Sequence, residues 1–138
     1  MRLFVDTSTL FKKYVEEMGS RDADMLFSEA TEMVVSPITR IEMHSAIAKY
    51  VRERWLSAPD AKKLSTEIKK DFAFYSLVYW NENLEEKSIE LAQALSLKAL
   101  DAIQLASGVL SKADLFVTSD KRLFDKASKV IHKTRFIR

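Results

Sequence analysis

Residues 2–8 read Arg2-Leu3-Phe4-Val5-Asp6-Thr7-Ser8, a short apolar strand that ends on a carboxylate and continues into hydroxyl side chains. Four more stretches have the composition of strands: 33–35, 77–80, 115–118 and, near the end of the chain, 135–137. Segments with helical periodicity separate them. This alternation is typical of βαβ units, so we expect an α/β fold built on a parallel sheet.

Seven segments with a helical spacing of apolar residues connect these strands. We expect helices over 8–16, 21–30, 36–55, 57–74, 84–97, 101–110 and 120–128. In the third of them, Ser36 is predicted to be the N-cap and Pro37 the first helical residue, because the missing N–H of proline costs nothing there. The segment from Asp101 to Leu110 is almost wholly apolar, which indicates a buried helix, and Gly108 would let it pack closely on the sheet.

The chain has 138 residues, the length of one ordinary domain, and 47% of them are apolar. A core of that size needs neither a disulfide nor a structural metal. There is no cysteine, which excludes a thiol nucleophile and a thiolate zinc site, and two glycines are too few for a Walker loop or a dinucleotide-binding fingerprint. The charged start is unlike a signal peptide, and no apolar run approaches the ~20 residues of a membrane span. We therefore expect a soluble cytoplasmic protein with no membrane partner.

Four carboxylates lie where a strand stops or a helix begins: Asp6, Glu42, Asp101 and Asp120. Asp6 and Asp120 directly follow strands, whereas Glu42 and Asp101 lie in the first turns of predicted helices. Ligand sites in an open parallel sheet lie beyond the carboxyl ends of the strands, and the helix starts point to the same edge. We therefore expect the four acids to converge there.

Each acid also has a purely structural interpretation. Thr39-x-x-Glu42 and Asp101-x-x-Gln104 have the spacing of capping boxes, and an Asp in the position of Asp120 often caps a helix. Taken singly, each acid is better explained as a cap or a surface charge, although Asp6 is tied to the buried first strand. Asp101 would start a buried helix, so its charge needs either helix-end N–H groups or a metal ion.

Considered together, the acids favour a divalent metal ion. Like charges held a few ångströms apart destabilise a fold unless a cation compensates them. Mg²⁺ takes oxygen ligands and binds through a few carboxylates together with waters and substrate phosphate. Neither His44 nor His132 has the spacing of a zinc site, and we interpret both as structural or surface residues.

Four segments, in this order, resemble the PIN-domain ribonucleases, and most closely the VapC-type toxins of bacterial and archaeal toxin–antitoxin pairs. They are Val5-Asp6-Thr7-Ser8, Ser36-x-x-Thr39-x-x-Glu42, Leu100-Asp101-Ala102-x-x-Leu105-Ala106 and Val117-Thr118-Ser119-Asp120-Lys121-Arg122-Leu123. The resemblance covers essentially the whole chain, which we interpret as one PIN-like domain, 1–138. One departure is the run Lys98-Ala99-Leu100, since an Arg or Pro often lies just before the third acid of the family.

The resemblance implies a three-layer α/β/α fold with a central parallel sheet of four to five strands. The acidic quartet of the family, which binds Mg²⁺ or Mn²⁺, corresponds to the four carboxylates above. Its small hydroxyl positions correspond to Ser8 and Thr118, as groups that orient ligands or water. Family members cut single-stranded or loop RNA, and many form homodimers bound by an antitoxin. We accordingly expect a metal-dependent endoribonuclease, the toxin of such a pair, with RNA, a cognate antitoxin and a second copy as partners.

Basic side chains accompany the acids. Arg40, Lys98, Lys121 and Arg122 are predicted to contact RNA phosphates, which adds affinity that depends on salt but reads no sequence. The net charge of the chain is only +2, but seven Lys or Arg against two Asp lie between Asp120 and the end of the chain. A solvated helix face explains most of these basic residues equally well.

Aromatic side chains allow two interpretations as well. Phe11, Tyr14 and Trp55 are available to stack on RNA bases, but core packing is the simpler role for each. Phe11, Tyr14, Val15 and Phe27 are likewise consistent with an apolar partner groove and with the core.

Two other functional classes are left open by the sequence. One is a metal-dependent phosphatase or phospho-acceptor domain. A phosphatase of the haloacid-dehalogenase type, however, has an acid two residues after its nucleophilic Asp, and the residue two positions after Asp6 is Ser8. A receiver domain needs a central Asp after a mid-chain strand, and Asp60 lies in a helix start instead. The other class is a PIN-like binding module without catalysis, against which the complete set of acids argues.

Overall fold

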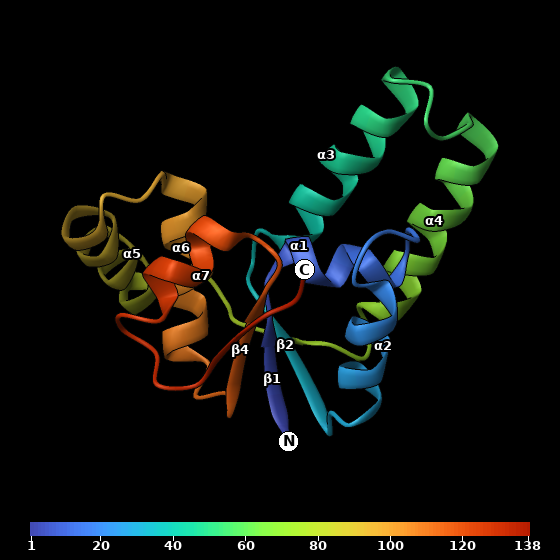
Figure 1. Cartoon of the computed structure of the whole chain (residues 1–138). Coiled ribbons are helices and arrows are strands. Elements are labelled where there is room, and N and C mark those ends of the chain that lie inside the picture. Colours follow the sequence, from blue (N-terminus) through green and yellow to red (C-terminus); the bar gives the residue numbers. More distant parts are fainter.

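Five parallel strands form one sheet at the centre of the computed structural model, which describes residues 1–138 (Figure 1). The strands are β1 (Arg2–Val5), β2 (Glu32–Val35), β3 (Ser76–Leu77), β4 (Leu115–Thr118) and β5 (Thr134–Phe136). They lie in the order β3-β2-β1-β4-β5, and every pairing is parallel. The predicted parallel sheet is confirmed, although its third strand is shorter than expected and ends at Leu77.

The first and fourth strands lie side by side in the middle of the sheet. Val5 pairs with Val117, so Asp6, which follows β1, and Thr118, the last residue of β4, lie together at the carboxyl edge. The chain order reverses at this point, because β2 and β3 extend the sheet on one side of β1 while β4 and β5 extend it on the other. Such a switch point is where open α/β sheets bind ligands.

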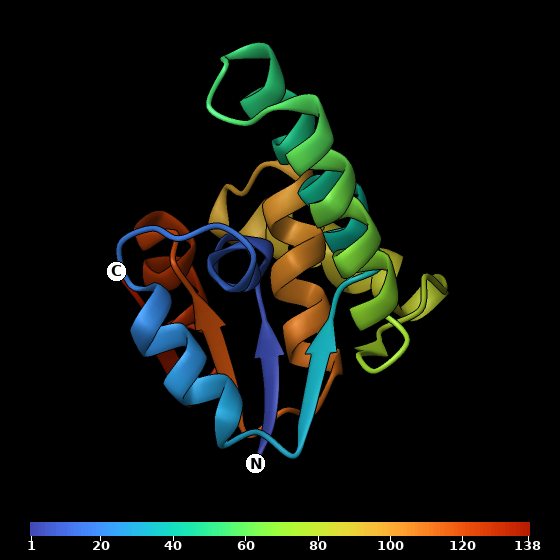
Figure 2. The same cartoon turned by 90° about the vertical axis from the view of Figure 1, so that its right-hand side faces the viewer.

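Helices cover both faces of the sheet (Figures 1 and 2). They are α1 (Thr7–Leu10), the 3₁₀ helix η1 (Phe11–Lys13), α2 (Ser20–Ser28), α3 (Thr39–Arg52), α4 (Ala58–Asp71), α5 (Glu82–Leu95), α6 (Ala99–Leu110) and α7 (Lys121–Ala127). No helix is both long and apolar enough to cross a membrane.

Alternating side chains of the strands supply two separate cores. Leu3 and Val5 point into one core, together with buried residues of α1 to α4, whereas Phe4 points into the other, together with residues of α5, α6 and α7. This alternation follows from the two-residue period of a strand. The three-layer α/β/α arrangement implied by the resemblance is confirmed.

Gly108 sets the distance between α6 and the sheet. A Cβ atom at this position would lie 2.4 Å from a ring carbon of Phe116, whose ring stacks on that of Phe4 with centroids 5.3 Å apart. The close packing predicted for Gly108 is therefore confirmed.

Several helix starts differ from the prediction. The helix expected from Ser36 begins at Thr39, because the Ser36 hydroxyl accepts a hydrogen bond from the Ile38 N–H (3.2 Å) and forms a turn before the helix. The segment 8–16 divides into α1 and η1 and ends by Lys13. The helix expected from Asp101 begins two residues earlier, at Ala99, and Asp101 lies in its first turn, as predicted.

A hairpin of two long helices, α3 and α4, projects beyond the carboxyl edge of the sheet (Figures 1 and 2). Ser57 caps α4, since its hydroxyl accepts a hydrogen bond from the Asp60 N–H (3.2 Å). Trp55 lies in the turn between the helices and is 79% exposed. Its predicted place in the core is wrong, because it lies in the turn at the projecting end of the hairpin.

Candidate active site

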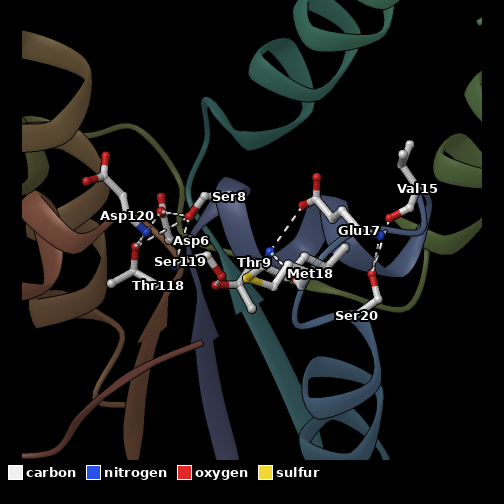
Figure 3. A network of polar contacts seen from close by, with 11 residues as sticks. Asp6, Ser8, Thr9, Val15, Glu17, Met18, Ser20, Thr118, Ser119 and Asp120 are labelled. Carbon is white, nitrogen blue, oxygen red and sulfur yellow. Dashed lines mark hydrogen bonds and ion pairs between the residues drawn. The ribbon is translucent and has the colours of Figure 1, made fainter. Parts of the chain in front are cut away.

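Asp6 is buried at the end of β1 and is held by two hydroxyl groups (Figure 3). Its Oδ2 atom accepts hydrogen bonds from Ser8 Oγ (2.7 Å) and Thr118 Oγ1 (2.8 Å). Its backbone N–H donates to the Val117 carbonyl (2.9 Å). One oxygen of the carboxylate is thus fixed between α1 and β4, and Oδ1 has no protein donor.

The two hydroxyl groups are themselves oriented by backbone donors. Ser8 Oγ accepts from the Ser119 N–H (3.0 Å), and Thr118 Oγ1 accepts from the Asp120 N–H (3.1 Å). Since each hydroxyl has a single proton and an N–H occupies its acceptor side, both protons point to Asp6. The structure therefore brings Ser8 and Thr118 together around the first acid.

Glu42 reaches the same edge from the first turn of α3. Its Oε1 atom accepts hydrogen bonds from Thr7 Oγ1 (2.7 Å) and Gln104 Nε2 (2.7 Å). Sequence reasoning missed both donors, and it assigned Gln104 to a capping box with Asp101. The available signal was one fully polar amide in an otherwise apolar helix, which needs a partner when it is buried.

Both capping-box interpretations are wrong. The α6 and α3 helices have no side-chain hydrogen bond at their N-caps, Lys98 and Ile38. Gln104 turns to Thr7 and Glu42, and Thr39 Oγ1 shares a hydrogen bond with Ser36 Oγ (3.1 Å). Both places have the spacing of a capping box, but the Gln104 and Thr39 side chains form hydrogen bonds with other residues instead of capping their helices.

Asp120 is an N-cap, as one of its two interpretations predicted. Its Oδ1 atom accepts hydrogen bonds from the N–H groups of Arg122 (2.9 Å) and Leu123 (3.1 Å) at the start of α7. Oδ2 has no protein donor. Capping therefore uses one oxygen and leaves the other for a ligand.

Asp101 is half-buried and accepts no hydrogen bond from the protein, which fits neither full burial nor a capping role. Burial, and then the charge of Asp120, raises the pKa of Asp101 against the opposing charges of Arg122 and Lys98. Neither capping nor any other hydrogen bond within the protein therefore explains the presence of a carboxylate at position 101.

The charges of the acids act on one another. Burial raises the pKa of Asp6 to about 6, even though the hydrogen bonds from Ser8 and Thr118 lower it, and the charges of Glu42 and Asp120 raise it further. None of the four acids forms an ion pair with a Lys, Arg or His. These charges link Asp6 to Glu42 and Asp120, and Asp101 to Asp120, and no protein cation forms an ion pair with any of the four.

The donor set fits a hard divalent ion. Asp6, Glu42 and Asp120 each keep one oxygen without a protein donor, and Asp101 keeps both. No three of the acidic or histidine side chains are arranged to ligate one ion together. The side chains that would hold such an ion are those of Asp6, Glu42, Asp101 and Asp120, and waters would complete its oxygen ligands.

The four basic residues predicted to bind RNA divide into two pairs. Lys98 and Arg122 are exposed and close enough to Asp101 to influence its pKa. Lys121, in contrast, forms an ion pair with Asp125 (3.0 Å). Arg40 lies over the ring of Phe72, 4.7 Å from its centroid.

Phe11 and Tyr14 are buried in the core shared by α1 to α4, so their structural interpretation is confirmed. Val15 and Phe27 are partly buried against the same core. His44 bonds through Nδ1 to the Arg40 carbonyl (2.8 Å), a structural contact, and His132 is exposed.

Comparison with known proteins agrees with this arrangement. The family model of the PIN domain matches residues 3–130. The chain belongs to the PIN-domain family. Among curated proteins, none matches the sequence.

Solved structures share the PIN fold across the whole chain. A toxin–antitoxin complex from Klebsiella pneumoniae contains a chain with a TM-score of 0.72 and 20% identity, over 100% of this chain and 98% of that one. VapBC2 from Rickettsia felis, bound to a DNA fragment from its promoter, gives a TM-score of 0.71 at 10% identity, with both chains covered in full. VapBC-1 from nontypeable Haemophilus influenzae gives 0.71 at 13% identity, over 99% and 98% of the two chains. At these identities the likeness is one of fold.

Proposed function

We propose that this PIN-domain chain is a metal-dependent endoribonuclease. The observation that supports the proposal is the set of four acids at the sheet's switch point. Three of them are anchored through one oxygen and present the other, and none has a cationic partner. Such an arrangement costs stability through like-charge repulsion, so it calls for a ligand that reverses the sign.

Mg²⁺ or Mn²⁺, when bound, supplies an activated water and neutralises charge on a scissile phosphate. The protein supplies the placement. Asp6 and Glu42 are the anchored ligands, Asp101 is the unanchored one, and Asp120 completes the set from the start of α7. Ser8 and Thr118 hold Asp6 Oδ2 in place, which keeps Oδ1 turned to the site.

RNA is the substrate class that we propose, and Lys98 and Arg122 are its nearest cationic contacts. Both are exposed beside Asp101, so each can approach a phosphate next to the one that is cleaved. Lys121 and Arg40 are already engaged by Asp125 and Phe72, and we assign them a smaller contribution.

The structural relatives suggest the biological context. Several of them are toxin–antitoxin or VapBC complexes. We therefore propose that this chain is a toxin with a cognate antitoxin, and that it forms a homodimer. Co-expression with a neighbouring antitoxin, followed by sizing of the purified complex, tests both parts.

Cleavage-end mapping on total RNA tests the activity. The protein should generate new RNA ends in Mg²⁺ or Mn²⁺, and neither EDTA-treated protein nor the Asp6→Asn variant should do so. Asp24→Asn is the matched control, because Asp24 is an exposed acid on α2 and should leave cleavage unchanged. Absence of metal-dependent ends from the wild-type protein would favour the alternative of a PIN-like binding module.

A further inference from the structure

A glutamine in the apolar helix α6 connects three parts of the site. Gln104 is 1% exposed. Its Nε2 atom lies 2.7 Å from Glu42 Oε1 on α3, 2.8 Å from Thr7 Oγ1 on α1 and 3.3 Å from Thr39 Oγ1 on α3. No other side chain of α6 contacts both α1 and α3 through hydrogen bonds.

The count of hydrogens fixes the orientation of this amide. Thr7 donates its only hydroxyl proton to Glu42, so it can only accept from Gln104. Glu42 Oε1 can likewise only accept, and the two hydrogens of the NH₂ group match the two closest acceptors, Glu42 Oε1 and Thr7 Oγ1. Thr39 is the third and most distant. A flipped amide would set its carbonyl against the Glu42 carboxylate, which is repulsive.

The other end of the amide has no partner. Gln104 Oε1 is buried and accepts no hydrogen bond. A buried carbonyl without a donor costs stability, so Gln104 is a poor solution for packing alone. An apolar residue of the same length would fill the space without that cost. The NH₂ group is therefore what the site uses.

We propose that Gln104, assisted by Thr7, is the positioning residue of Glu42 in the nuclease reaction. The two donors meet on Oε1 and fix the rotation of the carboxylate, which leaves Oε2 as the oxygen that faces a divalent ion. Gln104 does not touch substrate or the reacting atoms in this role. The inference rests on the proposed function, because it assigns a task within the same site.

Thr7 gives the arrangement a second consequence. It directly follows Asp6 in the chain, so the hydrogen bonds from Gln104 to Thr7 and to Glu42 tie the end of β1 to α3. The spacing between the first two acids thus depends on the direct hydrogen bond from Thr7 to Glu42 and on one amide from a third helix. Removal of that amide should weaken metal binding more than it weakens the fold.

The matched variants are Gln104→Met and Gln93→Met, the second on the exposed side of α5. Thermal unfolding is measured in EDTA and along a Mn²⁺ titration, without RNA. Gln104→Met should raise the Mn²⁺ concentration for half-maximal stabilisation about ten- to hundredfold, the usual effect of losing a supporting hydrogen bond. It should raise the Mn²⁺ requirement for RNA cleavage in parallel. Gln93→Met should match the wild type in both.

A double-mutant cycle separates positioning from packing. Gln104→Met should have no further effect on the Mn²⁺ midpoint in a Glu42→Gln background, since its target is already gone. A Gln104→Met protein with a lower melting temperature in EDTA but the wild-type Mn²⁺ midpoint would overturn the assignment while leaving the nuclease intact. A wild-type protein that neither binds Mn²⁺ nor cleaves RNA would overturn both.

A second variant covers failure of Gln104→Met to fold. Thr7→Val removes the other donor to Glu42 Oε1 and keeps the shape of the side chain. It should raise the Mn²⁺ midpoint in the same direction. An unchanged midpoint in a folded Thr7→Val protein would also overturn the proposal.

Discussion

Two hydrogen-bonded carboxylates in this molecule have opposite surroundings: Asp6 is buried, whereas the Asp71 side chain is 23% exposed. Asp71, at the end of α4, accepts hydrogen bonds from Lys13 Nζ (2.8 Å) and from the Tyr14 hydroxyl (2.8 Å), which also bonds to the Tyr75 hydroxyl (2.7 Å). Burial alone would raise the pKa of Asp71, but these hydrogen bonds and the charge of Lys13 outweigh burial and lower it. Asp6 has hydroxyl donors only, and its pKa is raised to about 6 by burial, with Glu42 and Asp120 adding to the shift.

The difference separates a carboxylate that holds the fold together from one that is kept for a ligand. Asp71 joins η1 to α4, and its ion pair and hydrogen bonds satisfy it within the protein. Asp6 is oriented just as firmly, but its charge is opposed by its neighbours. The fold accepts that cost at the one edge where the sheet topology gathers four acids.

The largest difference between Asp6 and Asp71 is expected when the charge of each is removed in turn. Asp6→Asn should reduce RNA cleavage by more than about 100-fold, the upper range for residues that merely support a metal ligand. Asp71→Asn should leave cleavage unchanged at temperatures where the protein is folded, but lower its melting temperature. Initial cleavage rates and thermal unfolding on the same preparations check both. Comparable activity losses in the two variants would break the distinction.

Asp101 tests whether the unanchored acid belongs with Asp6. Asp101→Asn should abolish cleavage and leave the metal-free protein as stable or more stable, because it removes a charge that burial and Asp120 oppose. A capping residue would behave differently: Asp101→Ala would cost ~0.5–2 kcal/mol and keep activity. Cleavage assays with urea unfolding in EDTA decide between them, and full activity of Asp101→Asn would remove this residue from the site.

The two carboxylates should also give opposite pH dependence to the metal-free protein. The pKa of Asp6 rises from 3.8 to about 6 on folding, so its protonated form stabilises the fold below its ordinary pKa, and this contribution is lost as the pH rises through 6. The shift corresponds to about 3 kcal/mol. Asp71, whose pKa is lowered, contributes stability above its ordinary pKa that is lost as the pH falls. Urea unfolding in EDTA between pH 4 and pH 8, about the range of these shifts, should show a falling Asp6 contribution that Asp6→Asn removes. A pH profile unchanged by Asp6→Asn would contradict the raised pKa.

A smaller effect is expected at Tyr14, which supports Asp71. Tyr14→Phe removes the donor to Asp71 and the contact with Tyr75. It should cost about 1–3 kcal/mol, since Asp71 loses a donor in a partly buried place. Cleavage by the folded protein should not change. Tyr79→Phe, at an exposed tyrosine, is the control and should have the stability of the wild type in denaturant titration.

Features that depend on local sequence patterns were mostly predicted. Apolar runs and their spacing predicted the five strands and the layer arrangement. The positions of Asp6 and Asp120 at the ends of strands predicted one edge of the site. The two interpretations of Asp120 turned out to be compatible, since one oxygen caps α7 and the other is free.

The errors arose where distant parts of the chain meet. Gln104 lies 97 residues from Thr7 and 62 from Glu42, so no local pattern could pair them, and a capping-box spacing suggested another use. Trp55 has the composition of a core residue, but its exposure follows from how far the α3–α4 hairpin projects. Asp101 was expected at the start of a buried helix, yet it is only half-buried, and Ala99 and Leu100 in the same turn are exposed.

Calorimetric titration of Mg²⁺ and Mn²⁺ into the metal-free protein measures whether the four acids bind a divalent ion. We expect saturable binding by the wild-type chain, strong weakening in Asp6→Asn, and no change in Asp71→Asn. Equal binding by the wild-type and Asp6→Asn proteins, or no binding by the wild type, would contradict the assignment of the four acids to a metal-dependent site.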